Sequence, residues 1–312
     1  MSNTLSSVKG LGTENRIGYR QFVNDKQDFK DTQDDPNGAD EKAPIIFEDD
    51  AVQNFPTYKE FDLRVDIVKP EQFTETTKLT TVRGDDVDAG NGFMKSAKRN
   101  TATIKNANSP VGKIELKIDY DSVYKNFNSQ MQIGHVYGDV RKEGFAKGIK
   151  SRYANVYAIG NSTAQADMDY MKALAQFNKD NGGDGTFQYK GVATYAENLH
   201  LLDKTAMSPV LNGKSDFNVD FVGGKVDGTL TFEGSGYKYM PEGNKIGISA
   251  TIDGNTFEGT KGKVDTAGGF FGEDAKFLGG IYQENQAIGG SGTVQGTGTT
   301  FQGTFGAEKA TK

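Results

Sequence analysis

The stretch that decides the fold reads SDFNVDFVGGKVDGTLTF and spans residues 215–232. Apolar Phe217 and Val219 alternate with polar neighbours, and the alternation resumes after the pair Gly223-Gly224. A period of two indicates a strand with one buried face, and glycines between two such runs are typical of a tight hairpin. The stretch therefore predicts two antiparallel strands that share one apolar face.

The same alternation recurs on both sides of this hairpin. Eight candidate strands fall near residues 151–159, 185–195, 215–222, 225–233, 245–252, 255–264, 276–283 and 299–307. Consecutive hairpins with a common apolar face fit a sheet that closes on itself, because closure removes the exposed edge strands. We therefore predict an eight-stranded antiparallel β-barrel over residues 149–309.

A helical segment is expected between the first two of these strands. Ser162 is a suitable N-cap, Gln165 completes a capping box, and Gly182-Gly183 ends the helix. Its apolar stripe comprises Tyr170, Met171, Leu174 and Phe177. The stripe either packs on the barrel or, at a barrel rim, forms a contact surface for a partner protein.

The first half of the chain divides into two parts. Residues 1–44 are polar, with a short strand near 15–23, and we expect this segment to be partly mobile. Residues 45–148 are expected to form a small β-sheet domain. Its predicted strands lie near residues 60–67, 76–82, 101–105, 114–120 and 131–137, with a loop over 84–92.

Composition excludes several classes of site. The chain has 312 residues, a net charge of −6, two histidines and no cysteine. It therefore has no cysteine–zinc site and no disulfide, and its charge gives no attraction to nucleic acid. Neither histidine lies near a G-x-S-x-G sequence, and no phosphate-binding glycine loop precedes a helix. We predict a binding protein and no enzymatic activity.

The two histidines and one leucine-rich loop are the remaining candidates for binding a ligand or a partner. His135 is in phase with apolar Met131 and Ile133, so it is either a buried strand histidine or a ligand of haem iron. His200 is either a second axial ligand or an ordinary loop residue. It lies in a loop with Leu199, Leu201 and Leu202. Exposed leucines are costly unless they contact something, which makes this loop a second candidate partner surface.

An ordered series of motifs resembles a known family. The series comprises GTFQYKG at 185–191, GGFFGEDA at 268–275, LGGIY at 278–282 and FGAEK at 305–309. It resembles the barrel of transferrin-binding protein B-like proteins. The glutamate at position 308 departs from the family's ending, in which a basic residue follows F-G-A directly.

The resemblance implies a surface or secreted protein of a Gram-negative bacterium that works beside a TonB-dependent outer-membrane receptor. The favoured hypothesis is capture of host haemoglobin, or of haemoglobin–haptoglobin, for iron acquisition, with no cofactor required. A lipid anchor outside this sequence would be its membrane attachment. The alternatives are a haem carrier similar to haemophilins and an adhesive surface protein without an iron role. We expect Leu199→Asp or Met171→Asp to weaken partner binding without unfolding the protein.

Overall fold

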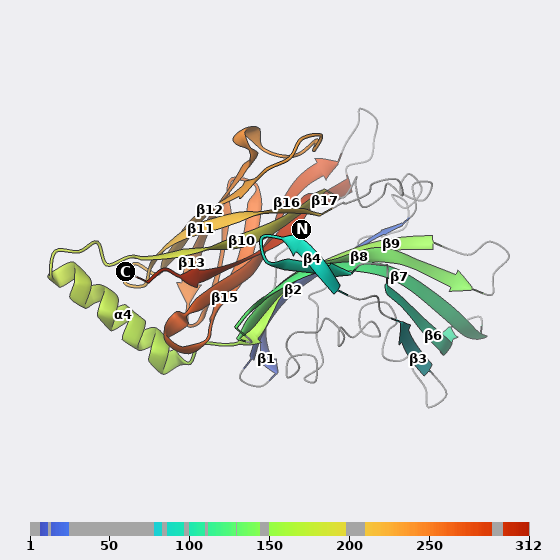
Figure 1. Cartoon of the computed structure of the whole chain (residues 1–312), viewed down its shortest axis with the longest axis horizontal. Helices are drawn as coiled ribbons and strands as arrows, with labels where there is room; N and C mark the ends of the chain where they lie inside the picture. The colour runs from blue at the N-terminus through green and yellow to red at the C-terminus, as the bar shows by residue number, and fades with distance from the viewer. Residues whose placement is uncertain are drawn as a thin grey trace.

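The computed structural model describes residues 7–11, 14–24, 78–82, 86–96, 100–109, 112–128, 130–143, 150–197, 210–288 and 296–311. These residues form an open nine-stranded sheet, a closed eight-stranded barrel and the α-helix α4, Gln165–Asp180 (Figure 1). Among them, no helix has the length and apolar character needed to cross a bilayer. The mainly β architecture with a C-terminal antiparallel barrel confirms the predicted fold class.

Each strand of the barrel pairs with its neighbour in sequence, and β10 pairs with β17 to close the ring. The strands are β10 (Phe187–Glu197), β11 (Leu211–Asp220), β12 (Lys225–Phe232), β13 (Lys245–Asp253), β14 (Thr256–Lys261), β15 (Val264–Phe271), β16 (Phe277–Ile288) and β17 (Gly296–Lys309). The closing pair is antiparallel and sets Gly191 opposite Ala307. The predicted number of strands is correct.

The membership of the barrel differs from the prediction at two places. The segment near 151–159 belongs to the open sheet, so the barrel begins at Phe187 rather than at residue 149. The eighth strand is instead β15, which contains Gly268-Gly269 and lies between the candidate strands predicted near 255–264 and 276–283. Consequently α4 connects the open sheet to the barrel and does not lie between two barrel strands.

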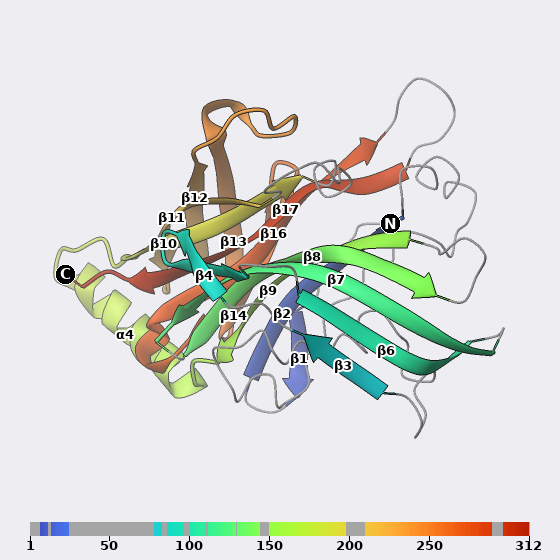
Figure 2. The ribbon, with the colours of Figure 1, turned by 45° about the vertical axis from the view of Figure 1, so that its right-hand side comes forward.

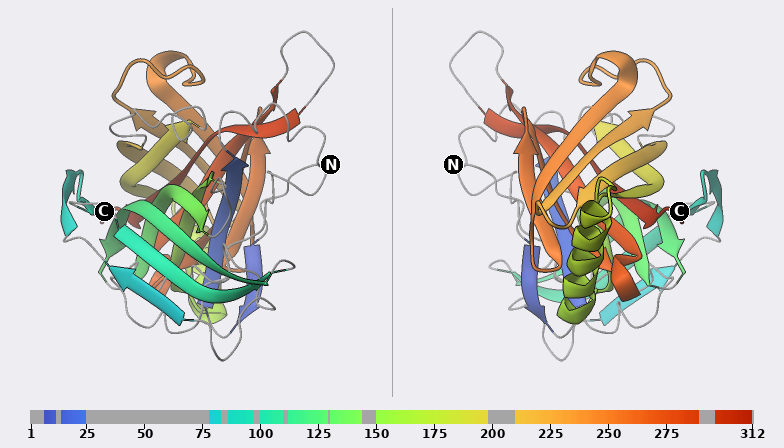
Figure 3. Two further views of the ribbon diagram at one scale, coloured as in Figure 1. Left: turned by 90° about the vertical axis from the view of Figure 1, so that its right-hand side faces the viewer. Right: turned by 90° about the vertical axis from the view of Figure 1, so that its left-hand side faces the viewer.

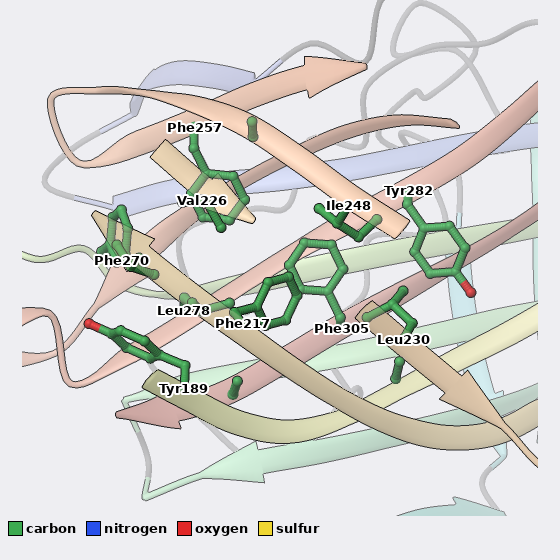
Figure 4. Close-up of a cluster of buried hydrophobic side chains, with 14 of the residues drawn as sticks. Tyr189, Phe217, Val226, Leu230, Ile248, Phe257, Phe270, Leu278, Tyr282 and Phe305 are labelled. Carbon is green, nitrogen blue, oxygen red and sulfur yellow. The ribbon is translucent and has the colours of Figure 1, made fainter. Parts of the chain in front are cut away.

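The barrel interior is filled with aromatic rings. Along β11, buried Ser215, Phe217 and Val219 alternate with exposed Asp216 and Asn218, as the period of two predicts. The ring centroids of Phe217 and Phe305 lie 4.9 Å apart, although their strands are far apart in sequence. Figure 4 shows these rings together with those of Tyr189, Phe257, Phe270 and Tyr282. The interior of the barrel is therefore a packed apolar core.

The open sheet has the order β1-β2-β9-β8-β7-β5-β4, and β6 pairs with both β7 and β3 (Figure 2). Its strands are β1 (Ser7–Leu11), β2 (Glu14–Asn24), β3 (Lys78–Val82), β4 (Asp86–Gly90), β5 (Phe93–Ser96), β6 (Asn100–Ser109), β7 (Gly112–Phe127), β8 (Met131–Glu143) and β9 (Lys150–Asn161). The expected loop over 84–92 is largely a hairpin of β4 and β5. The strand expected at 60–67 lies outside the described residues.

The sheet packs against the outside of the barrel through small residues. A β-carbon at Gly306 would lie 2.8 Å from the Phe127 ring and 3.0 Å from Cγ2 of Ile133. The rings of Phe127 and Phe277 meet edge to face with their centroids 5.8 Å apart. Glycine on the barrel surface thus allows a close contact between the two β bodies.

Candidate functional site

Helix α4 closes one end of the barrel. Its buried residues, Met168, Met171 and Ala175, belong to the same apolar cluster as the rings of the barrel interior. Their spacing of three and four residues places them on one face of the helix. In the right-hand view of Figure 3, α4 lies in front of the barrel strands. We call this the capped end of the barrel.

The start of the helix is fixed to the barrel by backbone and hydroxyl hydrogen bonds. The Thr163 N–H donates to the Phe270 carbonyl oxygen at 3.0 Å, and the Thr163 hydroxyl donates to the Gly272 carbonyl oxygen at 2.8 Å. Ser162 forms a β-bridge with Phe271. The predicted capping box is therefore wrong. The N-cap is Ala164, which makes no side-chain capping bond, and Ser162 lies two residues before it, in the bridge with the barrel.

The end of the helix is fixed by an ion pair. Nζ of Lys179 lies 3.3 Å from Oδ2 of Asp220 at the end of β11. Burial alone raises the pKa of Asp220, but hydrogen bonds from the Gly223 N–H and from Lys179 outweigh it, and the pKa is lowered. The aspartate is therefore held in the charged form that binds Lys179. Because α4 is fixed at both ends, its outer face is presented rigidly.

The outer face of α4 carries an exposed aromatic stripe. Tyr170 and Phe177 are 54% and 63% exposed, and with Val87 they are the large apolar residues that the described surface exposes. Exposed Ala166 and Ala173 lie on the same face, because successive spacings of four, three and four residues repeat along one side of a helix. We call these four residues the outer stripe. It lies opposite the buried Met168, Met171 and Ala175.

The sequence-based interpretation of α4 was only partly right. Tyr170 and Phe177 are exposed as a partner surface requires, and Leu174 is half-buried beside them. The prediction that Met171 lies on that surface is wrong, because its side chain is fully buried against the barrel. Sequence reasoning also missed Ala166 and Ala173. Two sets of residues repeat with helical spacing on opposite faces of α4. One set contains the methionines and the other contains alternating alanine and aromatic residues, and this difference is the signal that could have separated the faces.

The predicted leucine-rich loop is joined to the other end of the barrel. Strand β10 runs away from α4 and ends at Glu197, and β11 returns from Leu211. Leu199, His200, Leu201 and Leu202 lie between these strands, outside the described residues. β10 and β12 both end here, and we call this end of the barrel the strap end, because the segment described below as the strap follows β12.

His135 lies in the contact between the open sheet and the barrel. It is fully buried on β8, in register with Val123 and Val156, and Val156 packs on Ala267 and Ile281 of the barrel. Burial lowers the pKa of His135 to about 3, so the imidazole is neutral at physiological pH. A porphyrin could reach this ring only if the sheet separated from the barrel. The surroundings of His135 thus do not fit a haem ligand.

The second question is whether the described side chains form a cluster of metal ligands. Within the part of the chain that the structure describes, no three histidine, aspartate or glutamate side chains lie close enough to hold a metal ion. His200, the other predicted haem ligand, is outside that part. The exposed aromatic stripe is therefore the feature of the described surface that is best suited to bind another molecule.

Comparison with known proteins identifies the barrel. Residues 182–309 match the family described as C-lobe and N-lobe beta barrels of Tf-binding protein B. An uncharacterized protein of Haemophilus influenzae (strain ATCC 51907 / DSM 11121 / KW20 / Rd) is 33% identical over 107 residues, which cover 32% of this chain. The matched part spans 33% of the length of that relative.

A solved structure gives a further comparison. Isotype 1 transferrin binding protein B from serogroup B Neisseria meningitidis aligns over 96% of this chain and 78% of its own, with 12% identity and a TM-score of 0.32. The family match begins five residues before β10 and ends at Lys309, the last residue of β17. It therefore covers the complete closed barrel, and residues 182–309 belong to the transferrin-binding protein B-like barrel family.

Proposed function

We propose that this chain is a bacterial cell-surface protein that captures an iron-carrying host protein for iron acquisition. The barrel family supports this, because its description and the meningococcal protein named above both refer to binding of transferrin. For this chain we propose haemoglobin or haemoglobin–haptoglobin as the ligand and a TonB-dependent outer-membrane receptor as the acceptor. A lipid anchor on the outer membrane would hold it at the surface. The proposed role is binding without catalysis.

The observation that carries the proposal is the outer stripe. Tyrosine and phenylalanine provide large contact areas with few rotatable bonds, and aromatic side chains dominate the energy of many protein interfaces. Alternating alanines leave room between the two rings for side chains of a partner. Because α4 is fixed to the barrel at both ends, little conformational entropy is lost when a partner binds to it.

The proposal is tested by capture on immobilised host proteins. Haemoglobin, haemoglobin–haptoglobin and transferrin are presented separately to the purified chain and to the double variant Tyr170→Ala/Phe177→Ala. We expect retention on haemoglobin and at least tenfold weaker binding by the double variant. Lys172→Ala is the matched control, since Lys172 is exposed on the same helix but lies outside the outer stripe. Equal binding by the parent chain, the double variant and Lys172→Ala would rule out α4 as the docking surface.

The leucine-rich segment between β10 and β11 is a separate candidate surface. Leu199→Asp adds a charge to this segment without changing α4. If haemoglobin binding is lost in Leu199→Asp but kept in the double variant, the partner binds the leucine-rich segment and not the outer stripe. If both variants lose binding, the partner needs both the segment and the outer stripe.

The two alternatives are separated by a titration with haemin that is run beside the capture experiment. A haem carrier gives a saturable Soret shift when the free chain is titrated with haemin, and the shift is lost in His135→Ala or His200→Ala. An adhesive protein binds none of the three host proteins and gives no shift. The burial of His135 argues against the first alternative. Absence of a shift together with retention on haemoglobin would support capture of the intact host protein.

A further inference from the structure

The connection between β12 and β13 folds across the strap end of the barrel. It comprises residues 233–244, and we call it the strap. Its side chains Tyr237, Tyr239 and Met240 are half-buried and pack against the apolar core of the barrel. The ring of Tyr237 meets that of Tyr195 edge to face, with the centroids 5.5 Å apart. The strap thus covers the rings at this end of the barrel.

One buried carboxylate holds the strap in place. Glu197, the last residue of β10, is fully buried. Its Oε2 accepts a hydrogen bond from the Lys238 N–H at 3.0 Å, and its Oε1 accepts one from the Tyr239 N–H at 2.6 Å. The hydroxyl of Tyr195 also donates to Oε1, at 2.8 Å. Two consecutive backbone amides of the strap therefore bind the same carboxylate.

The charge of Glu197 makes this contact strong. Hydrogen bonds to an ionised acceptor contribute more than those between neutral groups, and a buried carboxylate is stable only when such donors surround it. The carboxylate of Glu197 also acts on the neighbouring tyrosines. Burial and then Glu197 raise the pKa of Tyr237, and the pKa of Tyr195 is raised by burial, by Glu197 and, to a smaller extent, by Tyr282 and Glu284. Both phenols therefore stay protonated, and Tyr195 remains a donor.

The strap has a narrow base and hinge-like ends. Nδ2 of Asn244 donates to the Gly234 carbonyl oxygen at 3.3 Å, which brings the two ends of the strap together. Gly236 and Gly243 have φ angles of +87° and +75°, and a β-carbon on either would meet nothing within 4 Å. Glycine is the residue that adopts such angles without strain. The two glycines carry no side chain that restricts rotation of the backbone at either end of the intervening segment.

We propose that the strap is a lid, latched by Glu197, that opens as a unit while the barrel stays folded. Opening breaks the two backbone hydrogen bonds to Glu197 and withdraws the Tyr237 ring. It uncovers Tyr195, whose ring also contacts Phe232 and Phe301 at centroid distances of 5.5 and 5.2 Å. The lid lies at the end of the barrel opposite α4. It is thus independent of the proposed docking of a partner on the outer stripe.

Tryptic cleavage after Lys238 measures opening of the lid. The Lys238 side chain is exposed, but the N–H of the next residue, Tyr239, is bound to Glu197 in the closed lid. Cleavage of that peptide bond therefore requires the latch to release. In Glu197→Gln the charge is lost and an amide group faces the two backbone donors. We expect cleavage after Lys238 to become at least tenfold faster.

Two further variants make the result specific. Glu242→Gln removes an exposed carboxylate from the strap itself and is expected to leave the cleavage rate unchanged. Tyr237→Ala removes the covering ring without changing the carboxylate and is expected to accelerate cleavage as well. Hydrogen exchange is followed in parallel, and the amides of β12 and β16 are expected to keep their protection in every variant.

Two outcomes would overturn the proposal. Unchanged cleavage after Lys238 in both Glu197→Gln and Tyr237→Ala would show that neither group holds the strap. Faster cleavage accompanied by an equal loss of protection in β12 and β16 would show that the barrel opens globally and that the strap is not a separate lid.

Discussion

The hydroxyl oxygen of Thr304 lies 2.9 Å from the carbonyl oxygen of Tyr157 and 2.9 Å from that of Gly280. Thr304 belongs to the barrel and Tyr157 to the open sheet, so one buried hydroxyl joins the two bodies. The N–H of Thr304 is bound separately, by the hydroxyl oxygen of Thr194 at 3.0 Å. The contact between sheet and barrel therefore has a polar component within its apolar surroundings.

Thr304→Val should destabilise the protein by about 1–3 kcal/mol, because it keeps the shape of the side chain and removes the shared hydroxyl donor. The midpoint of urea denaturation measures the loss. Thr251→Val, on the exposed face of β13, is the matched control and should change the midpoint little. Equal shifts in the two variants would show that the hydroxyl of Thr304 contributes nothing specific.

Gly306→Ala should destabilise the protein by a comparable amount, about 1–3 kcal/mol, because the new methyl group would be forced against Phe127 and Ile133. The same denaturation experiment tests this, with Ser235→Ala on the exposed strap as control. In a Phe127→Leu background Gly306→Ala should cost less, because leucine lacks the ring carbons Cε2 and Cζ that the new methyl group would meet. Unaltered stability of Gly306→Ala would mean that the sheet can move away from the barrel at no cost.

Met171→Asp should unfold α4 from the barrel and cost about 3 kcal/mol or more, since it places a carboxylate in an apolar core. Tyr170→Asp, one residue earlier on the exposed outer stripe, should leave the thermal midpoint almost unchanged. The pair of variants separates the two faces of the helix by calorimetry. A stable Met171→Asp protein would contradict the burial of this methionine and restore it as a candidate contact residue.

Stability should fall between pH 7 and pH 5 because of His135. Its pKa is lowered from 6.5 to about 3 by burial, so the unfolded chain binds a proton in this range and the folded chain does not. The stabilisation is complete above pH 6.5 and is lost as the pH falls toward 3. At pH 5 the loss is about 2 kcal/mol.

His135→Leu removes this titration and should flatten the dependence of the unfolding free energy on pH between 7 and 5. The comparison is made as the difference between the variant and the parent chain, because carboxylates titrate in both. His200→Leu serves as the control for the other histidine. An NMR measurement that places the pKa of His135 near 6.5 would show that the interface admits water or protons at this side chain.

The alternation of polar and apolar residues predicted most of the barrel correctly, and the errors have identifiable physical causes. Strand β15 was missed because Gly268 and Gly269 lack side chains and so carry no periodicity. They lie opposite Gly280 and Gly279 in the neighbouring strand, and a β-carbon on Gly268 would overlap the ring of Phe257. The glycines therefore mark close packing and not a turn.

The assignment of β9 to the barrel was wrong because local sequence reports alternation but not the partner strand. The strand pairs with β8, which precedes it directly, and with β2, whose residues lie more than 100 positions away in sequence. Whether Met171 packs on the barrel or faces a partner was left open for a similar reason. A helix with two apolar faces does not reveal by its own sequence which face meets the barrel.

The two attachments of α4 also determine how the helix responds to force. Its first turn is held by Thr163 and Ser162, and its last turn by the ion pair of Lys179 with Asp220. A load applied to the middle of the helix, where Tyr170 lies, is divided between both attachments. They must then yield together and cannot be peeled away one after the other. If a ligand bound to the outer stripe is pulled by flow or by a moving cell, both attachments thus resist the force at the same time.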